Sequence, residues 1–128
     1  MTNAPERRPI RMIVADDAPF IREIVRHLAE KSGIDLVAEA IDGEDAVRLA
    51  LELNPDLILM DIIMPKMSGI EATKAILAKL PNMKIVAFST ADQETMVMRA
   101  LEAGCCSFCV KPFKAEELIA AIRKTVAS

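Results

Sequence analysis

Five polar side chains in this sequence follow short apolar runs and are of types that can do chemistry together. They are Asp16, Asp17, Asp61, Ser89 and Lys111. If the apolar runs are parallel strands of one sheet, their carboxyl ends share an edge and these side chains meet there. Clustered carboxylates repel one another unless a cation lies among them. Because carboxylate oxygens are ligands that Mg²⁺ prefers, the sequence predicts a magnesium site at this edge.

The hydroxyl and the ammonium group extend this site toward phosphoryl transfer. Lys111 can pair with Asp61 and afterwards with a phosphoryl oxygen, and Ser89 can donate a hydrogen bond to another such oxygen. Phosphoryl transfer depends mainly on positioning and on stabilised charge, and a carboxylate can itself be the nucleophile. The predicted product is an acyl phosphate on Asp61.

Each of these residues also has a structural alternative. Asp16 or Asp17 could cap a helix that begins near Pro19, and Lys111 could be a solvated surface charge. The joint occurrence of all five after the first, third, fourth and fifth runs favours the chemical interpretation. A cis peptide bond between Lys111 and Pro112 would aim the ammonium group inward.

The elements that must position these residues follow from the hydrophobic pattern. Apolar runs rich in Ile, Val and Leu occupy residues 11–15, 36–40, 57–60, 85–88 and 108–110. Helical spacing follows each of them, within residues 21–28, 46–53, 70–77, 97–101 and 118–122. The runs do not alternate with polar residues, which is typical of a parallel sheet covered by helices on both faces. The prediction is an α/β fold with five βα units, in which Pro55, Pro81 and Gly104 mark helix ends.

Composition bounds the class of protein. The chain has 128 residues, of which 52% are hydrophobic and 27% charged, so we expect one domain at 10–128 after a flexible leader at 1–9. The net charge of −3 comes without a basic stripe, which argues against direct nucleic-acid binding. No apolar run approaches the roughly 20 residues that cross a bilayer, and the start lacks a signal-peptide core. We therefore expect a cytoplasmic protein without membrane insertion.

Three cysteines lie within five positions. Cys105, Cys106 and Cys109 have a spacing that suits neither a disulfide framework nor a zinc site, and the single histidine, His27, is far away in sequence. We expect them to be small buried hydrophobic residues near one strand. A redox role is the open alternative.

The motifs together resemble the receiver domains of bacterial response regulators over residues 10–126. The resemblance is carried by Asp16-Asp17, Asp61 followed by Met64-Pro65-Lys66-Met67-Ser68-Gly69, Ser89-Thr90-Ala91, and Ala103-Gly104 leading to Lys111-Pro112-Phe113. It implies a doubly wound, flavodoxin-like sheet with strand order 2-1-3-4-5. It also implies a stand-alone receiver similar to the chemotaxis response regulator, acting in two-component signalling.

The same resemblance implies a role for each site residue. Asp61 becomes the phosphoacceptor, and Mg²⁺ is held by Asp16, Asp17 and Asp61 with the backbone carbonyl of Ile63. Ser89 becomes the switch hydroxyl and Lys111 the cation that contacts the phosphoryl group. The expected donor is a phosphohistidine on a sensor histidine kinase or on a histidine phosphotransfer domain. Small acyl phosphates are expected to substitute.

The resemblance also implies how the phosphoryl group is read. Phe108 takes the place of an aromatic residue that swings inward once the hydroxyl of Ser89 has moved, with core packing as the alternative. The surface of the fourth helix, fifth strand and fifth helix would then contact a downstream protein. Met96 and Met98 are expected to be partly exposed there. Ile63 and Ala91 occupy positions that tune phosphoryl lifetime, and because neither can hydrogen-bond a water, we expect a lifetime of minutes or longer.

Other functions are open to a site of this composition. A haloacid-dehalogenase-type phosphatase would need a second Asp two residues after the nucleophile, where this chain has Ile63, so separate substrate turnover is not expected. A pseudo-receiver that binds partners without phosphorylation is a further alternative. A flavodoxin-like cofactor binder would need a glycine-rich phosphate loop that the sequence lacks.

Overall fold

Strands and helices alternate along the chain and build one parallel sheet. The computed structural model describes residues 8–90 and 93–128. Within these residues the strands are β1 (Arg11–Ala15), β2 (Asp35–Ala40), β3 (Leu57–Asp61), β4 (Lys84–Thr90) and β5 (Ser107–Lys111). The helices are α2 (Pro19–Lys31), α3 (Gly43–Leu53), α4 (Gly69–Lys79), α5 (Glu94–Ala103) and α6 (Ala115–Ala127). The strand order β2-β1-β3-β4-β5 confirms the predicted doubly wound fold.

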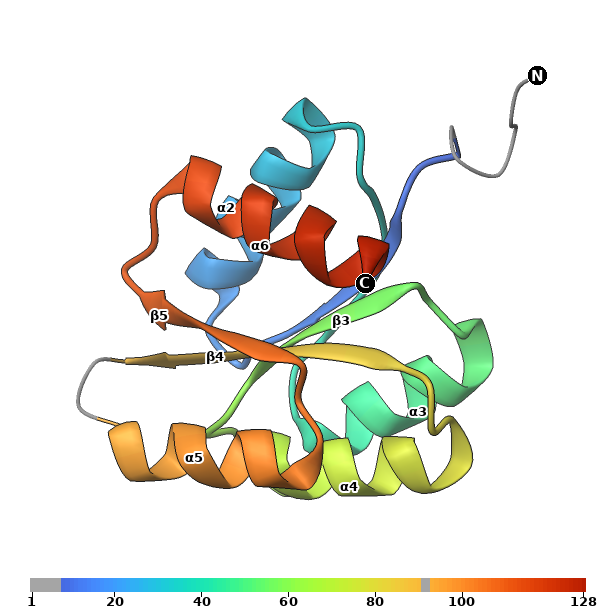
Figure 1. Ribbon diagram of the computed structural model, residues 1–128, viewed down its shortest axis with the longest axis vertical. Helices are drawn as coiled ribbons and strands as arrows, with labels where there is room; N and C mark the ends of the chain where they lie inside the picture. Colours follow the sequence, from blue (N-terminus) through green and yellow to red (C-terminus); the bar gives the residue numbers. More distant parts are fainter. Residues whose placement is uncertain (1–7, 91–92) are drawn as a thin grey trace.

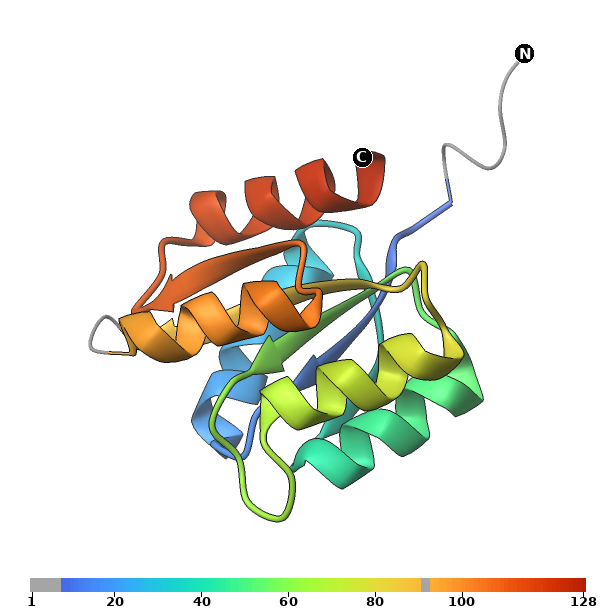
Figure 2. The ribbon, with the colours of Figure 1, turned by 60° about the horizontal axis from the view of Figure 1, so that its bottom comes forward.

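Helices cover both faces of the sheet. Helices α2 and α6 lie on one face (Figure 1), while α3, α4 and α5 lie side by side on the other (Figure 2). Side chains of β1, β3 and β4 alternate between two buried clusters, so Ile13 and Ile58 face the three-helix layer while Val14 and Leu59 face α2 and α6. The central strand β3 is buried along its whole length, as expected for a strand covered on both faces.

Polar residues at the carboxyl ends of the strands take part in the sheet ladder. Asp61 pairs with Phe88, and Thr90 pairs with Lys111. The apolar pattern predicts ends for β3, β4 and β5 that lie one or two residues before the observed ends. Hydrophobicity does not report where backbone pairing ends. The ladder fixes the direction of each side chain at this edge, since successive strand residues point to opposite faces.

The first helix does not use either aspartate as its N-cap. Helix α2 begins at Pro19, and its N-cap is Ala18, whose methyl side chain cannot accept a hydrogen bond. Asp16 instead accepts the N–H of Ala18 on its Oδ1, at 2.9 Å. Capping is therefore the wrong interpretation of Asp16 and Asp17, and the structure leaves both carboxylates at the edge of the sheet.

The predicted helix ends agree with the structure. Asn54, directly before Pro55, and Gly104 are C-caps in the left-handed conformation, with φ of 44° and 119°. Helix α4 ends at Lys79, two residues before Pro81. These stops set the lengths of the connections that lead into β3, β4 and β5.

The expectation that all three cysteines are buried is wrong for Cys106. Cys105 is buried and its Sγ lies 3.6 Å from the hydroxyl of Thr73, Cys109 is half-buried, and Cys106 is exposed. Burial raises the pKa of the Cys105 and Cys109 thiols. All three thiols are free. Cys106 precedes β5, an edge strand with a neighbour on one side, so burial is incomplete there.

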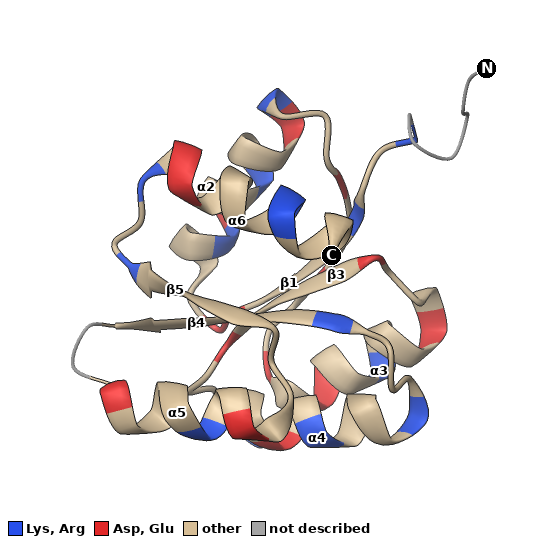
Figure 3. Cartoon of the chain, in the orientation of Figure 1, with Lys and Arg blue, Asp and Glu red and all other residues tan. Residues whose placement is uncertain are grey.

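Charges of both signs are interspersed over the helices, as Figure 3 shows along α4 and α5. This arrangement agrees with a small net charge of −3. Among residues 8–90 and 93–128, no helix combines the length and the apolar character that a membrane span requires.

Replacing Gly104 by alanine tests the αL end of α5. An added Cβ would lie 2.4 Å from Leu77 Cδ1, and the left-handed backbone itself costs an L-residue about 1–2 kcal/mol. We expect Gly104→Ala to lower the free energy of unfolding, measured with urea, by at least this amount. Gly33→Ala is the matched control, because Gly33 also has positive φ but has nothing within 4 Å of the added Cβ. An equal loss in both variants would contradict a packing contribution from Leu77.

Candidate functional site

The carboxyl edge of the sheet brings together the five side chains singled out from the sequence. Asp16 and Asp17 follow β1, Asp61 is the last residue of β3, Ser89 lies near the end of β4, and Lys111 ends β5. The strands that carry them are neighbours in the sheet. Their convergence follows from parallel pairing, which places every carboxyl end at one edge.

The three carboxylates form a compact oxygen cluster. One oxygen from each of Asp16, Asp17 and Asp61 can be chosen so that all lie within 4.8 Å of one another. Asp16 is fully buried and Asp61 is 6% exposed, whereas Asp17 faces solvent. An all-oxygen, anionic set that is open on one side fits Mg²⁺, which keeps several waters and takes carboxylate ligands.

Lys111 is the cation that faces this cluster. Its Nζ lies 2.8 Å from Asp16 Oδ2 and 3.4 Å from Asp61 Oδ1, so the predicted pairing with Asp61 is present but Asp16 is the closer partner. The ammonium group also lies 5.3 Å from the centre of the Phe88 ring. The Lys111–Pro112 peptide bond is cis, as expected. Because the side chain is only 17% exposed, the interpretation of Lys111 as a solvated surface charge is wrong.

The surroundings of Asp61 make its ionisation unfavourable. Burial raises the pKa of Asp61 to about 6, and the negative charge of Asp16 adds to the rise. Lys111 and a hydrogen bond from the backbone of Ile63 act in the opposite direction. A cation bound among the carboxylates would therefore relieve a repulsion that one ammonium group leaves in place.

The hydroxyl of Ser89 is a buried polar group in need of a partner. Ser89 is 1% exposed, and its Oγ has no hydrogen-bond partner among the residues that the structure describes. Buried hydroxyls in folded proteins are nearly always hydrogen-bonded, so such an atom at a candidate site points to an absent ligand. A phosphoryl oxygen is a suitable acceptor.

The loop after Asp61 is held close to the site by tight backbone contacts. A Cβ added at Gly69 would lie 2.0 Å from the carbonyl oxygen of Asp61, and the N–H of Gly69 donates to the Ile62 carbonyl at 2.7 Å. Ser68 and Glu71 form a capping box at the start of α4. The Ile63 side chain is 51% exposed.

Phe108 lies at the surface and not in the core. Its ring is 45% exposed, so simple core packing is the wrong interpretation. It lines a pocket of about 370 Å³ together with Ser89, Val97, Met98 and other residues of α5, β4 and β5. The candidate switch hydroxyl and the candidate switch ring therefore border the same space. Ala91 lies outside the described residues.

Arg22 is a residue of this edge that the sequence pattern did not predict. Its Nη1 donates a hydrogen bond of 2.8 Å to the backbone carbonyl of Asp16. A cation one helical turn after Pro19 was the available signal, since the first turn of a helix that follows a strand lies at the same edge of the sheet.

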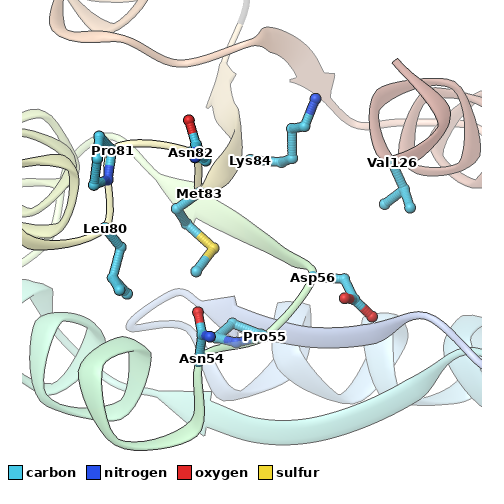
Figure 4. A pocket seen from close by; sticks show the side chains of 9 residues that line it. All are labelled: Asn54, Pro55, Asp56, Leu80, Pro81, Asn82, Met83, Lys84 and Val126. Carbon is cyan, nitrogen blue, oxygen red and sulfur yellow. The ribbon is translucent and has the colours of Figure 1, made fainter.

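A second pocket lies at the opposite edge, where β3 and β4 begin (Figure 4). It has a volume of about 490 Å³. The Asp56 carboxylate accepts the N–H of Arg11 at 2.8 Å and faces the guanidinium of Arg8, and Lys84 donates to the carbonyl of Ser128. The charged groups Asp56 and Lys84 of this pocket are thus engaged within the chain.

Comparison with known proteins agrees with this fold. The family model of the response regulator receiver domain matches residues 12–123. The chain belongs to this family. It is 40% identical to the chemotaxis protein CheY of Thermotoga maritima, over 89% of this chain and 95% of that protein. It is 41% identical to CheY of Bacillus subtilis, over 91% of this chain and 97% of that protein.

Solved structures give the same result. The response regulator domain of Thermotoga maritima CheB superposes with a TM-score of 0.87 and 34% identity, covering 94% of this chain and 98% of that one. A CheX–CheY–BeF3–Mg complex from Borrelia burgdorferi has a TM-score of 0.88 and 27% identity, covering 95% of this chain and 92% of that one. The predicted family and fold are therefore confirmed.

The raised pKa of Asp61 predicts a pH-dependent effect of Asp61→Asn in the absence of metal. The unfolded carboxyl titrates near 3.8 and the folded one near 6, so the folded state binds more protons in this window and loses stability as the pH rises through it. Asparagine removes this loss. In a chelator at pH 7.5 we expect Asp61→Asn to raise Tm by a few degrees, with the gain shrinking toward pH 4.

Differential scanning fluorimetry across this pH range measures the effect. Magnesium added to the wild type should recover much of the same gain, because it offsets the same repulsion. An Asp61→Asn variant less stable than the wild type at pH 7.5 in chelator would contradict the electrostatic account.

Proposed function

We propose that this chain is a phosphoacceptor switch of a two-component system, in which Asp61 accepts a phosphoryl group from a phosphohistidine. The proposal rests on the groups that surround one buried carboxylate, that of Asp61. Asp61 lies beside two further carboxylates and the ammonium group of Lys111. On the neighbouring strand β4, the buried hydroxyl of Ser89 has no hydrogen-bond partner among the described residues. Membership of the receiver family supports the same function.

The transfer step uses Asp61 as the nucleophile. A carboxylate oxygen of Asp61 forms a bond to phosphorus while the P–N bond to the donor imidazole breaks, and the imidazole recovers a proton from solvent. Mg²⁺, bound by Asp16, Asp17, Asp61 and the carbonyl of Ile63, would supply positive charge for the phosphoryl oxygens. The Borrelia burgdorferi complex, which contains Mg and BeF3, supports this assignment by similarity.

Lys111 and Ser89 have complementary roles in this proposal. Lys111 pairs with Asp16 and Asp61 before transfer, and afterwards its ammonium group pairs with a phosphoryl oxygen. Ser89 then donates the hydrogen bond for which it has no acceptor among the described residues. Both groups act by position and charge, which is how most of the catalysis of phosphoryl transfer arises.

The signal would reach a partner through α5, β5 and α6. Movement of Ser89 toward the phosphoryl group changes the pocket that it shares with Phe108, and the ring can then turn inward. Met98, Phe108 and Val110 are exposed on this surface, whereas Met96 is half-buried. Their exposure supports contact with a downstream protein at this surface. The proposed phosphoryl donor is a sensor histidine kinase or a histidine phosphotransfer domain. We place these contacts in the cytoplasm.

The alternatives have less support. A phosphatase would need an acid two residues after Asp61, but that position is the apolar, half-exposed Ile63. We therefore propose no turnover of a separate substrate. A pseudo-receiver would not require the buried cluster of Asp16, Asp61 and Lys111, which is unfavourable to maintain without a ligand.

Incubation with acetyl phosphate and Mg²⁺ tests the proposal by intact-mass spectrometry. We expect one phosphoryl adduct that requires Mg²⁺ and is lost in Asp61→Asn, because the variant has no nucleophilic carboxylate. Asp35→Asn is the matched control, since Asp35 is exposed at the amino end of β2 and should leave the adduct unchanged. Absence of an adduct with both acetyl phosphate and a phosphohistidine donor would favour the pseudo-receiver.

The lifetime of the adduct is a separate prediction. Ile63 and Ala91 cannot orient an attacking water by hydrogen bonding, so we expect the phosphoryl group to persist for minutes or longer without a phosphatase. Decay is followed by intact mass after removal of acetyl phosphate. Ile63→Asn should shorten the lifetime several-fold, because its amide can hold a water. Spontaneous decay of the wild type within a few seconds would contradict this expectation.

A further inference from the structure

Arg22 links three elements around the candidate metal site. It lies at the end of the first turn of α2, its Nε lies 3.4 Å from Glu39 Oε1 on β2, and its Nη1 donates to the backbone carbonyl of Asp16 at 2.8 Å. The side chain is only 17% exposed. We propose that Arg22 is a positioning residue that fixes the Asp16–Asp17 peptide and thereby sets the affinity of the site for Mg²⁺. This inference rests on the proposed function, because it concerns the metal of that site.

The geometry of the loop explains why one carbonyl matters. Asp16 is held through its backbone N–H, which donates to Ala40 O at 3.0 Å, and through its carboxylate, which accepts from Ala18 and Lys111. The carbonyl of Asp16 belongs to the same planar peptide as the N–H of Asp17. Holding that oxygen therefore fixes the direction in which the exposed Asp17 leaves the loop.

Glu39 orients the guanidinium of Arg22 so that it can hold the Asp16 carbonyl. Arg26, one turn further along α2, makes hydrogen bonds of 2.8 and 3.0 Å with Glu39, and chiefly this pairing holds the pKa of Glu39 below its usual range. The ionised carboxylate attracts the Nε end of Arg22 while the Nη1 end reaches the loop. An arginine can do both because its donors form a rigid planar fork.

The positive charge of Arg22 would have the opposite effect on the affinity for Mg²⁺. A cation near a metal site repels the metal, so removal of the charge alone would tighten Mg²⁺ binding. Loss of positioning would weaken it, because misplaced ligands and outer-shell partners typically cost about tenfold or more in metal affinity. The two effects have opposite signs, and the direction of the change decides between them.

The test compares Arg22→Gln with Arg26→Gln. Both arginines lie on α2 and pair with Glu39, but Arg26 donates its hydrogen bonds to Glu39 and Arg22 also contacts the loop. Titration of the metal-free proteins with MgCl2 by isothermal calorimetry gives Kd, and Tm in chelator gives the purely structural effect. We expect Arg22→Gln to weaken Mg²⁺ binding about tenfold, and Arg26→Gln to leave Kd nearly unchanged.

Further variants keep the inference testable if Arg22→Gln folds poorly. Arg22→Lys keeps the charge but loses the planar fork that reaches two partners, so its Kd should lie between those of the wild type and Arg22→Gln. Glu39→Gln keeps both arginines but loosens the anchor of Arg22, and should also weaken binding. An unchanged or lower Kd in the Arg22 variants, with Mg²⁺ binding intact in the wild type, would overturn the inference alone. A wild type that does not bind Mg²⁺ would overturn the proposed function and this inference with it.

Discussion

The repulsion among buried carboxylates at one edge of the sheet is the constraint on which the rest of the structure depends. Asp16 and Asp61 are both nearly inaccessible, and Lys111 is the ammonium group placed between them at 2.8 and 3.4 Å. Leaving such charges unpaired in the interior is strongly destabilising. The neighbouring strands β1, β3, β4 and β5 must therefore end in a fixed register, and the two helical layers hold that register by burying the strands.

The same register joins the site to the surface. In the β4–β5 ladder, Thr90 pairs with Lys111 and Ser89 pairs with Val110. Ser89 borders the pocket that Phe108 lines, and Phe108 and Val110 are both exposed. A displacement of the Ser89 hydroxyl would therefore act on a packed group of side chains next to the surface. Packed protein interiors change between discrete arrangements rather than deforming smoothly. This contiguity is a physical basis for a two-state switch.

Much of the fold and of the site could be predicted from the sequence, because both depend on local signals. The apolar runs predicted the five strands, and the resemblance to receiver domains predicted their order in the sheet. The polar residues at the strand ends predicted the cluster of Asp16, Asp61 and Lys111. Individual side-chain contacts and the exposure of single residues could not be predicted this way. Arg22 reaches Asp16 through a side-chain direction that no periodicity encodes. The exposure of Cys106 depends on the position of β5 at the edge of the sheet, and a run of apolar residues does not report edges.

Two features of the site lower the stability of the protein alone, and the proposed ligands would offset both. A carboxyl whose pKa is raised to about 6 and a buried hydroxyl without a partner among the described residues both make the folded state less favourable. Natural proteins accept such costs mainly where function requires them. A cation among the carboxylates and a phosphoryl oxygen near Ser89 would remove both costs at once. In the proposed switch, the energy that the ligands restore would be available to bias the surface next to Phe108, because a ligand shifts a conformational equilibrium only through its differential affinity for the two states.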